Sequence, residues 1–253
     1  MKISTINKDN IEKKIKNNPT SFVNWYPQIK NVVKTPLSKW WDISYEDFIS
    51  IIGLLDGIEI AKNSKERFDF IIKEIKSFGK EVGYPLFLKN YVFSGKHSWD
   101  RTCFIESDKN IFKHIRDIIF ESEMVMCECG LGFVARQFID TSYSPFKAFE
   151  GMPVVKERRY FIKDKKVYGR QEYWVEGAFE NENLTKKQWQ ELRTLNLQDK
   201  KEIEYLKFET EKIIKVLDGN WSVDWLMDSK GHWWCIDLAE MHKSYISKTL
   251  IQF

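Results

Sequence analysis

The sequence predicts an α+β protein, because it combines two β-hairpins with several amphipathic helices. Residues 154–174 and 221–240 each place a polar turn between two β-prone runs, which is typical of a hairpin. Residues 44–55, 64–82 and 110–125 instead repeat isoleucine and phenylalanine every three or four positions, as one buried helix face requires. At 253 residues the chain is long enough to form one large domain or two lobes.

The composition is that of a soluble globular protein, with 43% hydrophobic and 30% charged residues. The net charge of +3 is the small difference between 40 basic and 37 acidic residues, which is too balanced to predict nucleic-acid binding by charge. The sequence has no apolar run near the roughly 20 residues of a membrane span, and its first residues are polar where a signal peptide would be apolar. We therefore expect a cytoplasmic protein with no nucleic-acid or membrane partner.

The four cysteines do not predict a disulfide framework in a chain of this length. Cys127 and Cys129 form a C-x-C pair that could ligate a metal. Structural zinc usually needs a second pair or suitably spaced histidines, and the sequence shows neither. Buried thiols are therefore the favoured interpretation of Cys103, Cys127, Cys129 and Cys235.

The first part of the chain predicts a mixture of helix and strand. A short helix is expected over residues 10–16, and residues 32–36 predict a short strand that ends at a proline. The helix over 44–55 begins at Ser44, whose side chain is suited to the N-cap, and the helix over 64–82 follows. No motif in this part indicates a particular chemistry.

Residues 84–105 predict a strand, a loop and a second strand. The first strand ends on Lys89, and the loop contains Ser94, Gly95 and Lys96. Backbone N–H groups of such a loop can close on phosphate oxygens, while the two ammonium groups neutralise the charge. The segment is not a P-loop, because it lacks the glycines and the following helix of that motif. The alternative is that Lys89 is an ordinary surface residue.

The next elements supply a strand with an embedded arginine and two more helices. After the helix over 110–125, residues 132–140 predict a strand that carries Arg136. Helices are expected over 185–198 and 199–217, and a glycine ends the second one.

The run Lys156-Glu157-Arg158-Arg159 opens the first hairpin. Because alternate side chains on a strand share a face, we expect Glu157 and Arg159 on one face and Lys156 and Arg158 on the other. Arginine is almost never buried without a partner, and a planar charged fork on a rigid strand suits phosphate recognition. An edge strand with a solvated charged face is the alternative.

The second hairpin carries two aspartates within apolar strands. An unpaired carboxylate at Asp224 or Asp237 would be costly, so each needs a cation. With Glu240 just beyond them, they form a set of hard oxygen ligands suited to Mg²⁺. Without a cation, two facing carboxylates would repel each other. The alternative is a pair of ordinary carboxylates at strand ends.

Four motifs follow one another between residues 85 and 240: PLFLK with SGKHSW, ARQFID, KERRYFI with GRQEYW, and SVDW with CIDLAE. In this order they resemble the ATP-grasp superfamily. More narrowly, they resemble its clade marked by two arginines and one lysine, which is similar to the family of the eukaryotic assembly chaperone for translation initiation factor two. The resemblance implies an ATP-grasp fold, in which two α/β lobes hold ATP between two antiparallel sheets. Residues 1–82 would be the substrate or partner side, and residues 83–253 the nucleotide-binding region.

The resemblance also implies which residues bind the nucleotide. Lys89 would contact the α- and β-phosphates, and the loop after it would cover the phosphates. Gln137 and Phe138 would offer backbone groups to adenine. The implied nucleotide-binding residues are Lys89, Ser94, Gly95, Lys96, Gln137, Phe138, Asp140, Glu157 and Arg159.

The remaining implied roles are catalysis and metal binding. Arg136 and Arg159 would be the two arginines of the clade and would act in catalysis together with Lys89. The implied Mg²⁺ ligands are Asp224, Asp237 and Glu240. Many relatives have an asparagine two residues after the second aspartate, where this chain has Ala239, so Glu240 would complete the set.

The implied activity is an ATP-dependent carboxylate–amine ligase. Such an enzyme transfers the γ-phosphoryl group of ATP to a carboxylate, and an amine then attacks the acylphosphate to form an amide. Positioning, Mg²⁺ and arginine charge carry this chemistry, so the absence of an evident nucleophile in the sequence is consistent with it. The carboxylate would belong to a small molecule, an amino acid, a peptide or a protein. Two alternatives remain: an ATP-binding protein-assembly factor without ligase turnover, and a scaffold that binds a protein partner without nucleotide.

Overall fold

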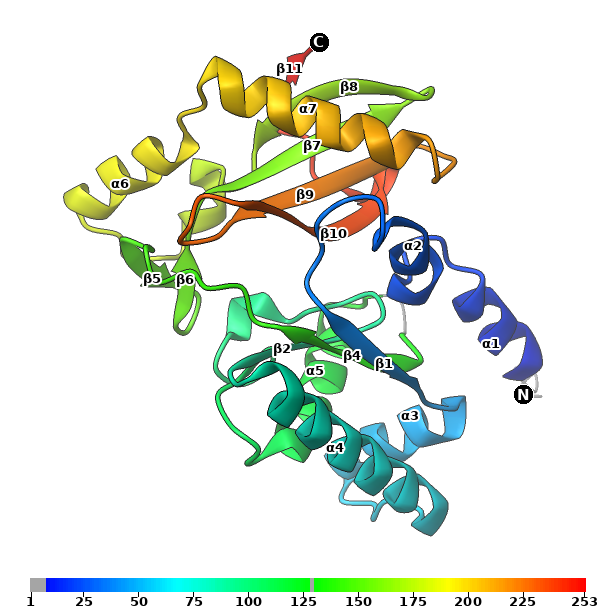
Figure 1. Cartoon of the computed structure of the whole chain (residues 1–253). Helices are drawn as coiled ribbons and strands as arrows, with labels where there is room; N and C mark the ends of the chain where they lie inside the picture. Colours follow the sequence, from blue (N-terminus) through cyan, green and yellow to red (C-terminus); the bar gives the residue numbers. More distant parts are fainter. Residues whose placement is uncertain (1–7, 128–129) are drawn as a thin grey trace, which may run out of the picture. The chain divides into compact units, whose positions relative to one another are not determined.

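The computed structural model describes residues 8–127 and 130–253, which form two compact units (Figure 1). The first unit contains the residues up to Asn24 together with Leu37–Phe138, and the second contains Trp25–Pro36 and Ile139–Phe253. Each unit has an antiparallel sheet with helices, so the predicted α+β class is confirmed. The functional division into residues 1–82 and 83–253 stays a prediction.

The first unit is built on a four-stranded antiparallel sheet. In spatial order the strands are β1 (Ser38–Asp42), β4 (Gly132–Gln137), β2 (Leu86–Asn90) and β3 (Phe104–Ile105). Three helices contribute to the apolar core against this sheet: α3 (Tyr45–Ile52), α4 (Lys62–Val82) and α5 (Ile111–Met124). Leu88, Phe133 and Ala135 bring the sheet into the same core, so the opposite face of β2 and β4 is available for other groups.

The helices predicted for this unit are confirmed, and so is the start of α3. The hydroxyl of Ser44 accepts a hydrogen bond from the Asp47 backbone N–H at 3.1 Å, and the Asp47 carboxylate accepts the Ser44 N–H at 2.9 Å. This reciprocal pair is the capping box that satisfies two backbone donors at a helix start. A short helix, α1 (Lys8–Lys16), lies at the beginning of the described chain, and two 3-10 turns, η1 (Gly53–Asp56) and η2 (Lys96–Ser98), complete the unit.

The second unit is built on a five-stranded antiparallel sheet. In spatial order the strands are β10 (Trp233–Glu240), β9 (Trp221–Met227), β7 (Glu157–Lys163), β8 (Lys166–Glu172) and β11 (Ile251–Gln252). Both predicted hairpins, β7–β8 and β9–β10, are confirmed. The unit also contains a small hairpin, the helices and two 3-10 turns: β5 (Phe146–Ala148), β6 (Met152–Val154), α6 (Lys186–Asn196), α7 (Lys200–Ile214), η3 (Glu176–Phe179) and η4 (Met241–Lys243).

Helix α7 lies across one face of this sheet (Figure 1). The indole N–H of Trp225 on β9 donates to the hydroxyl of Thr210 at 3.2 Å, and the hydroxyl of Tyr160 on β7 donates to the Ile203 carbonyl at 3.4 Å. These bonds satisfy the polar ends of two buried aromatic residues under the helix. Residues one position along each strand therefore face away from α7.

The strand predicted over residues 32–36 is wrong. Helix α2 (Phe22–Ile29) ends just before it, and the backbone N–H groups of Val32 and Val33 both donate to the Ile29 carbonyl, at 2.8 and 3.1 Å. The segment therefore completes the end of a helix that the sequence analysis did not include. The first strand of the chain is instead β1, which begins two residues after Pro36.

Two predicted strands are shorter than expected: the strand over 132–140, and the strand over 102–105 that follows the predicted loop. The strand predicted over 132–140 ends at Gln137, and the strand predicted to begin at Thr102 begins at Phe104. The reason at Thr102 is that its hydroxyl closes the preceding turn, so its backbone does not enter the ladder.

The prediction of buried thiols is confirmed for two of the three cysteines that the structure describes. Cys103 and Cys235 are buried and Cys127 is partly exposed, whereas Cys129 lies outside the described residues. None of the helices in the described ranges combines the length and the apolar character that a bilayer span requires.

Candidate functional site

Lys89 and Arg136 lie on one face of the sheet in the first unit. Lys89 on β2 pairs with Val134 on β4, and Arg136 pairs with Phe87 on β2. Because Leu88 and Ala135 point into the helical core, Lys89 and Arg136 point to the opposite face. Both residues are only 3% exposed, and charged side chains are rarely buried unless they serve a partner or a ligand. The structure thus brings two of the three predicted catalytic residues onto one surface of this unit.

Arg136 is held in place by groups of its own unit. Its Nε donates to the hydroxyl of Ser38 on β1 at 3.2 Å, and its guanidinium carbon lies 5.4 Å from the centre of the Phe22 ring. Such a stacked guanidinium keeps a fixed direction, which pre-organises it for a planar anion.

The loop predicted to cover phosphates is an ordered turn. Gly95 has a φ of 65°, and a side chain there would meet Thr102 at 3.0 Å, so only glycine fits. The hydroxyl of Thr102 lies 2.6 Å from the Gly95 carbonyl and 2.8 Å from the Ser98 carbonyl. Ser94 and Lys96 flank this glycine and are partly buried. All three predicted loop residues are therefore on one tight turn, and their contact with phosphate stays a prediction.

The sequence analysis missed what anchors the start of this loop. The side-chain carbonyl of Asn90 accepts hydrogen bonds from the backbone N–H groups of Val92, at 2.8 Å, and Phe93, at 2.5 Å. An asparagine at a strand end is a signal for this kind of turn.

Gln137 and Phe138, the residues predicted to bind adenine, lie where β4 ends. The backbone N–H of Gln137 donates to the Leu37 carbonyl at 2.8 Å, so that donor is already used. The ring of Phe138 makes edge contacts with Phe104, at 5.5 Å between centroids, and Trp99, at 6.2 Å. We refer to Phe87, Trp99, Phe104 and Phe138 as the aromatic cluster.

The aromatic cluster was not identified from the sequence, although an aromatic content of 15% gave a general signal. Trp99 stacks on Phe104 with ring planes 20° apart, and it lies 5.9 Å from the Phe87 ring. A partly exposed aromatic surface beside a strand end offers a flat apolar ring a place to stack.

Asp140 is engaged in a structural turn of the second unit. Its carboxylate accepts hydrogen bonds from the hydroxyl of Ser229 and from the Ser142 N–H, and its carbonyl accepts the Ser229 N–H at 2.9 Å. The bond from Ser229 is the main reason that the pKa of Asp140 is lowered. Its contacts thus explain Asp140 as a support for the β9–β10 turn, and its predicted role with nucleotide stays untested.

The central feature of the second unit is a row of polar side chains that crosses four strands. Gln171 on β8 is paired with Arg159 on β7, Arg159 with Asp224 on β9, and Asp224 with Asp237 on β10. Residues paired across antiparallel strands share a face, so all four point away from α7. We call Gln171, Arg159, Asp224 and Asp237 the polar row.

Arg159 and Asp224 form a two-point ion pair within the polar row. Nε and Nη2 of Arg159 donate to the two carboxylate oxygens of Asp224 at 2.7 and 2.8 Å. The side chains are 16% and 8% exposed, and the Arg159 guanidinium carbon lies 4.9 Å from the centre of the Tyr173 ring. Burial alone would lower the pKa of Arg159, but the charges of Asp224 and, more weakly, Asp237 raise it above its ordinary value. Asp224 therefore has the cation that its buried carboxylate needs.

The neighbouring Arg158 points to the opposite face, as the sequence predicted. It is fully buried under the helices, where its Nε donates to Glu202 on α7 at 2.6 Å. Its Nη2 donates to the carbonyls of Leu195 and Leu197, both at 2.9 Å. These contacts mark Arg158 as a structural residue, which leaves Arg159 as the arginine of this strand that can serve a ligand.

Glu157 shares the face of Arg159, two residues before it on β7, and is 4% exposed. The predicted grouping of these two side chains on one face is thus confirmed. Its backbone carbonyl accepts the Tyr173 N–H at 3.4 Å, which continues the pairing with the next strand beyond the end of β8. Its predicted role in nucleotide binding is not tested by these contacts.

Two of the three predicted metal ligands fit a divalent cation. Asp224 and Asp237 face each other on adjacent strands and supply the hard oxygens that Mg²⁺ prefers. Glu240 lies three positions beyond Asp237, so its side chain projects from the other face, and it pairs with Lys243 at 3.2 Å. Within residues 8–127 and 130–253, no group of three or more histidine, cysteine, aspartate or glutamate side chains could hold a metal ion. The geometry fits a two-carboxylate site better than a three-carboxylate site, and the role of Glu240 stays a prediction.

Asp228 orders the turn that the sequence predicted for the β9–β10 hairpin. Burial alone would raise its pKa, but hydrogen bonds from the Trp234 indole, at 2.9 Å, and from the backbone N–H groups of His232, at 2.8 Å, and Lys230, at 2.9 Å, hold the pKa at about 2. Lys34 adds a cation 4.0 Å from the Asp228 carboxylate and 3.9 Å from the centre of the Trp234 ring. Asp followed by two small or polar residues and glycine was the sequence signal for the turn.

No family model and no curated protein sequence matches the chain. Among solved structures, C-terminally truncated Cdc123 from Schizosaccharomyces pombe aligns over 92% of this chain and 85% of its own, with a TM-score of 0.54 and 13% sequence identity. A second structure of Cdc123 from the same organism aligns over the same shares, with a TM-score of 0.52 and 14% identity. The chain has the fold of Cdc123. Because Cdc123 is the assembly chaperone of initiation factor two, this similarity confirms the resemblance that the motifs predicted.

A structure of the ATP-grasp type is also among the matches. The RimK domain protein of the ATP-grasp type from Sphaerobacter thermophilus aligns over 89% of this chain and 59% of its own, with a TM-score of 0.45 and 10% identity.

Proposed function

We propose that the chain binds Mg-ATP and uses it as a carboxylate–amine ligase that forms an amide through an acylphosphate. The observation that carries the proposal is the polar row, which presents a partly buried arginine and two carboxylates on one face of a sheet. Charged groups are costly to bury. A sheet face with a positively charged side chain next to negatively charged ones is suited to a phosphate group and its counter-ion.

Arg159 would hold a phosphate group of the nucleotide. In the ligand-free chain, Asp224 keeps the guanidinium charged and fixes its plane. A phosphate oxygen offers the same two-point geometry as a carboxylate, so Arg159 can exchange or share its partner without changing its own rotamer. Arg159 would also stabilise the charge that develops on the transferred phosphoryl group.

The first unit would supply the other contacts to ATP. Lys89 would neutralise the α- and β-phosphates, and Arg136, fixed by Ser38 and the Phe22 ring, would face the phosphates or the acyl substrate. Ser94, Gly95 and Lys96 would cover the phosphates with the turn that Thr102 closes. The backbone at Gln137 and Phe138 would bind adenine, and the aromatic cluster gives the ring an apolar surface. Glu157 and Asp140 would complete the nucleotide-binding set.

Asp224 and Asp237 would bind Mg²⁺, which in such ligases neutralises phosphate charge and holds the phosphates in line. Because both oxygens of Asp224 accept hydrogen bonds from Arg159, metal binding has to draw Asp224 at least partly away from that arginine. The two partners would then serve the metal and the phosphate separately.

A second candidate is an ATP-binding assembly factor that shapes a protein-binding surface without ligase turnover. The similarity to Cdc123 favours it, because the two Cdc123 structures match this chain better than the ATP-grasp structure named above. Both candidates require nucleotide binding, and they differ in whether ADP is released. For the ligase, we propose a cytoplasmic location and a small-molecule, amino-acid or peptide carboxylate as substrate. For the assembly factor, we propose a protein partner.

Calorimetric titration with Mg-ATP tests the nucleotide site. Replacing a charge-assisted phosphate contact should weaken binding by about 1.5–3 kcal/mol, which is roughly ten- to a hundredfold. We expect this loss in Lys89→Met and in Arg159→Met, but not in Lys201→Met, which changes an exposed lysine on α7. If both site variants bind Mg-ATP as tightly as the wild type does, Lys89 and Arg159 do not contact the phosphates.

Release of ADP then separates the two candidates. Wild-type protein would be incubated with Mg-ATP and a panel of amino acids and dipeptides. A ligase releases ADP only when its carboxylate and amine are both present, whereas an assembly factor binds ATP and gives no substrate-dependent ADP. ATP binding without such release by any member of the panel, including peptides from candidate protein partners, would favour the second candidate.

A further inference from the structure

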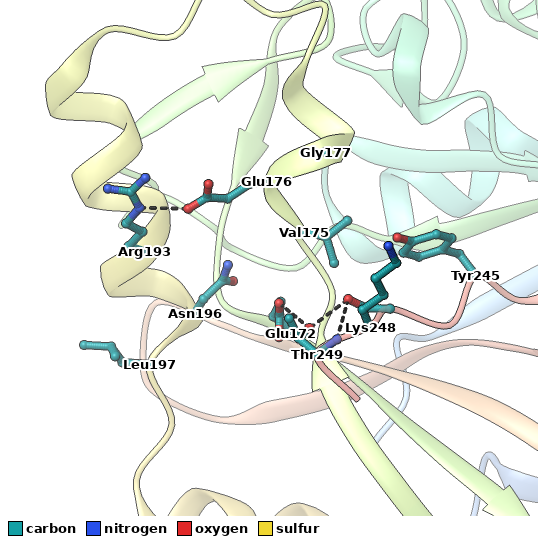
Figure 2. A pocket seen from close by; sticks show the side chains of 11 residues that line it. Glu172, Val175, Glu176, Gly177, Arg193, Asn196, Leu197, Tyr245, Lys248 and Thr249 are labelled. Carbon is teal, nitrogen blue, oxygen red and sulfur yellow. Dashed lines mark hydrogen bonds and ion pairs between the residues drawn. The ribbon is translucent and has the colours of Figure 1, made fainter. Parts of the chain in front are cut away.

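The second unit contains a cavity of about 520 Å³ that none of the proposed nucleotide contacts uses (Figure 2). The end of β8, the turn η3, the end of α6 and the segment 245–249 form its walls. Its walls combine apolar surface from Val175 and Leu197 with several hydrogen-bonding groups. A concave site with a few converging polar groups is the usual form of a small-molecule site.

Asn196 is one of the residues that line this cavity. Its side-chain nitrogen donates to the Trp174 carbonyl at 2.8 Å, which fixes the orientation of the amide. Its side-chain oxygen is buried and has no hydrogen-bond partner within the described residues. A buried acceptor without a partner is costly, so a ligand with an N–H donor would relieve this cost.

Glu172 adds a carboxylate to the lining of the cavity. One of its oxygens accepts a hydrogen bond from the hydroxyl of Thr249 at 2.7 Å, which fixes the side chain and leaves acceptor capacity on the carboxylate. Figure 2 shows Asn196 and Thr249 on either side of Glu172 in that view. Two acceptors, one of them anionic, favour an ammonium group as the occupant.

The basic side chains that line the cavity, Arg193 and Lys248, decide whether the ligand also carries a negative charge. Arg193 is engaged by Glu176 at 2.8 Å, so this pair is internally neutral. Lys248 is an exposed residue of the cavity lining, and its side chain is drawn in Figure 2. A carboxylate on the ligand would pair with Lys248, whereas a purely anionic ligand would meet the charge of Glu172.

We propose that this cavity binds an amino acid, or the same pair of charges at the end of a short peptide. Glu172 and the side-chain oxygen of Asn196 hold the ammonium group, Lys248 holds the carboxylate, and Val175 and Leu197 contact the side chain. Gln171 of the polar row is hydrogen-bonded to two residues of the cavity lining. Its side chain accepts the Ser247 N–H at 2.9 Å and donates to the Tyr245 carbonyl at 3.3 Å. Binding does not depend on ATP, so the proposal is independent of the nucleotide site.

Amide chemical shifts of the nucleotide-free, full-length protein test the proposal. The probes are the common amino acids in separate titrations, each compared with its N-acetylated form and with its C-terminal amide. We expect at least one amino acid to bind with a dissociation constant of about 1 mM or tighter and to shift the amides of residues 172–177, 193–197 and 245–249. Acetylation should abolish the effect, because it removes the ammonium group, and amidation should weaken it.

Two isosteric or near-isosteric variants identify the contacts. Glu172→Gln keeps the bond from Thr249 but loses the charge, and it should weaken the amino acid about tenfold or more. Lys248→Met should weaken the amino acid but leave its C-terminal amide unchanged. Glu211→Gln is the matched control, since Glu211 is an exposed residue of α7 outside the cavity, and it should bind as the wild type does.

The proposal is overturned if no amino acid shifts the cavity amides. It is also overturned if Glu172→Gln, with an unchanged melting temperature, binds as tightly as Glu211→Gln, or if N-acetylated probes bind as well as the parent amino acids.

Discussion

Each face of the sheet in the second unit carries an arginine paired with a carboxylate, but the two arginines differ in the rest of their hydrogen bonds. On the face under α7, Arg158 is fully buried and donates to Glu202, to two carbonyls at the end of α6 and to the carbonyl of Glu157. On the opposite face, Arg159 is 16% exposed, and its Nε and Nη2 both donate to one carboxylate, that of Asp224. The difference shows that the number and kind of acceptors, rather than the presence of an ion pair, separates a structural arginine from one that can exchange its partner.

Removing Arg158 should have the largest effect on stability. In Arg158→Met the Glu202 carboxylate and two buried carbonyls lose their donor, and breaking a buried ion pair costs about 3–5 kcal/mol. Denaturant unfolding should show this loss. Arg116→Met, which changes a partly exposed arginine paired with its neighbour Asp117, is the control and should cost less than about 1 kcal/mol. Equal stability of the two variants would contradict the structural role of Arg158.

Asp224→Asn should also destabilise the ligand-free protein, by about 1–3 kcal/mol, because Arg159 loses its counter-charge in a site with little solvent. This direction is opposite to the expectation from two facing carboxylates, where removal of one charge would relieve repulsion. Denaturant unfolding without nucleotide measures it. Asp237→Asn is the comparison, and we expect a smaller loss of stability there, since Arg159 interacts more strongly with Asp224 than with Asp237. A more stable Asp224→Asn protein would show that repulsion dominates.

The smallest expected effect concerns the turn at Asp228. Its folded-state pKa of about 2 lies below the ordinary 3.8, so ionised Asp228 stabilises the fold. This contribution is fully present above pH 3.8 and is lost as the pH falls towards 2. In Asp228→Asn that part of the pH dependence should disappear. Unfolding midpoints between pH 2 and pH 5 measure it, and an unchanged slope in the variant would assign the dependence to other carboxylates.

The features that were predicted correctly from the sequence are those that depend on residues close together in the chain. The opposite faces of Arg158 and Arg159 follow from strand alternation, and the hairpin turns follow from their polar residues. It did not predict that Asp224 would face Arg159, because the register of β7 against β9 joins residues 65 positions apart. The missed strand β1 has the same cause, since its partner β4 lies far along the chain.

Other errors came from turn and helix chemistry. The apolar pair Val32 and Val33 suggested a strand, but both N–H groups complete the end of α2. The hydrogen bonds that the Asp140 carboxylate accepts from Ser229 and Ser142 were also not predicted, because Ser229 belongs to a hairpin far along the chain. The predicted role of Asp140 in nucleotide binding stays untested. Glu240 projects from the opposite face of β10 to Asp237, and its predicted role as a metal ligand stays untested.

The central claim is that the polar row binds Mg-ATP, and melting temperatures with and without Mg-ATP test it most directly. Mg-ATP should raise the melting temperature of the wild type, because a ligand that binds only the folded state stabilises it in proportion to the logarithm of its concentration over its dissociation constant. The rise should shrink in both Asp224→Asn and Asp237→Asn, although only Asp224→Asn is markedly less stable without ligand. An undiminished rise in both variants would contradict the metal site and the ligase function built on it.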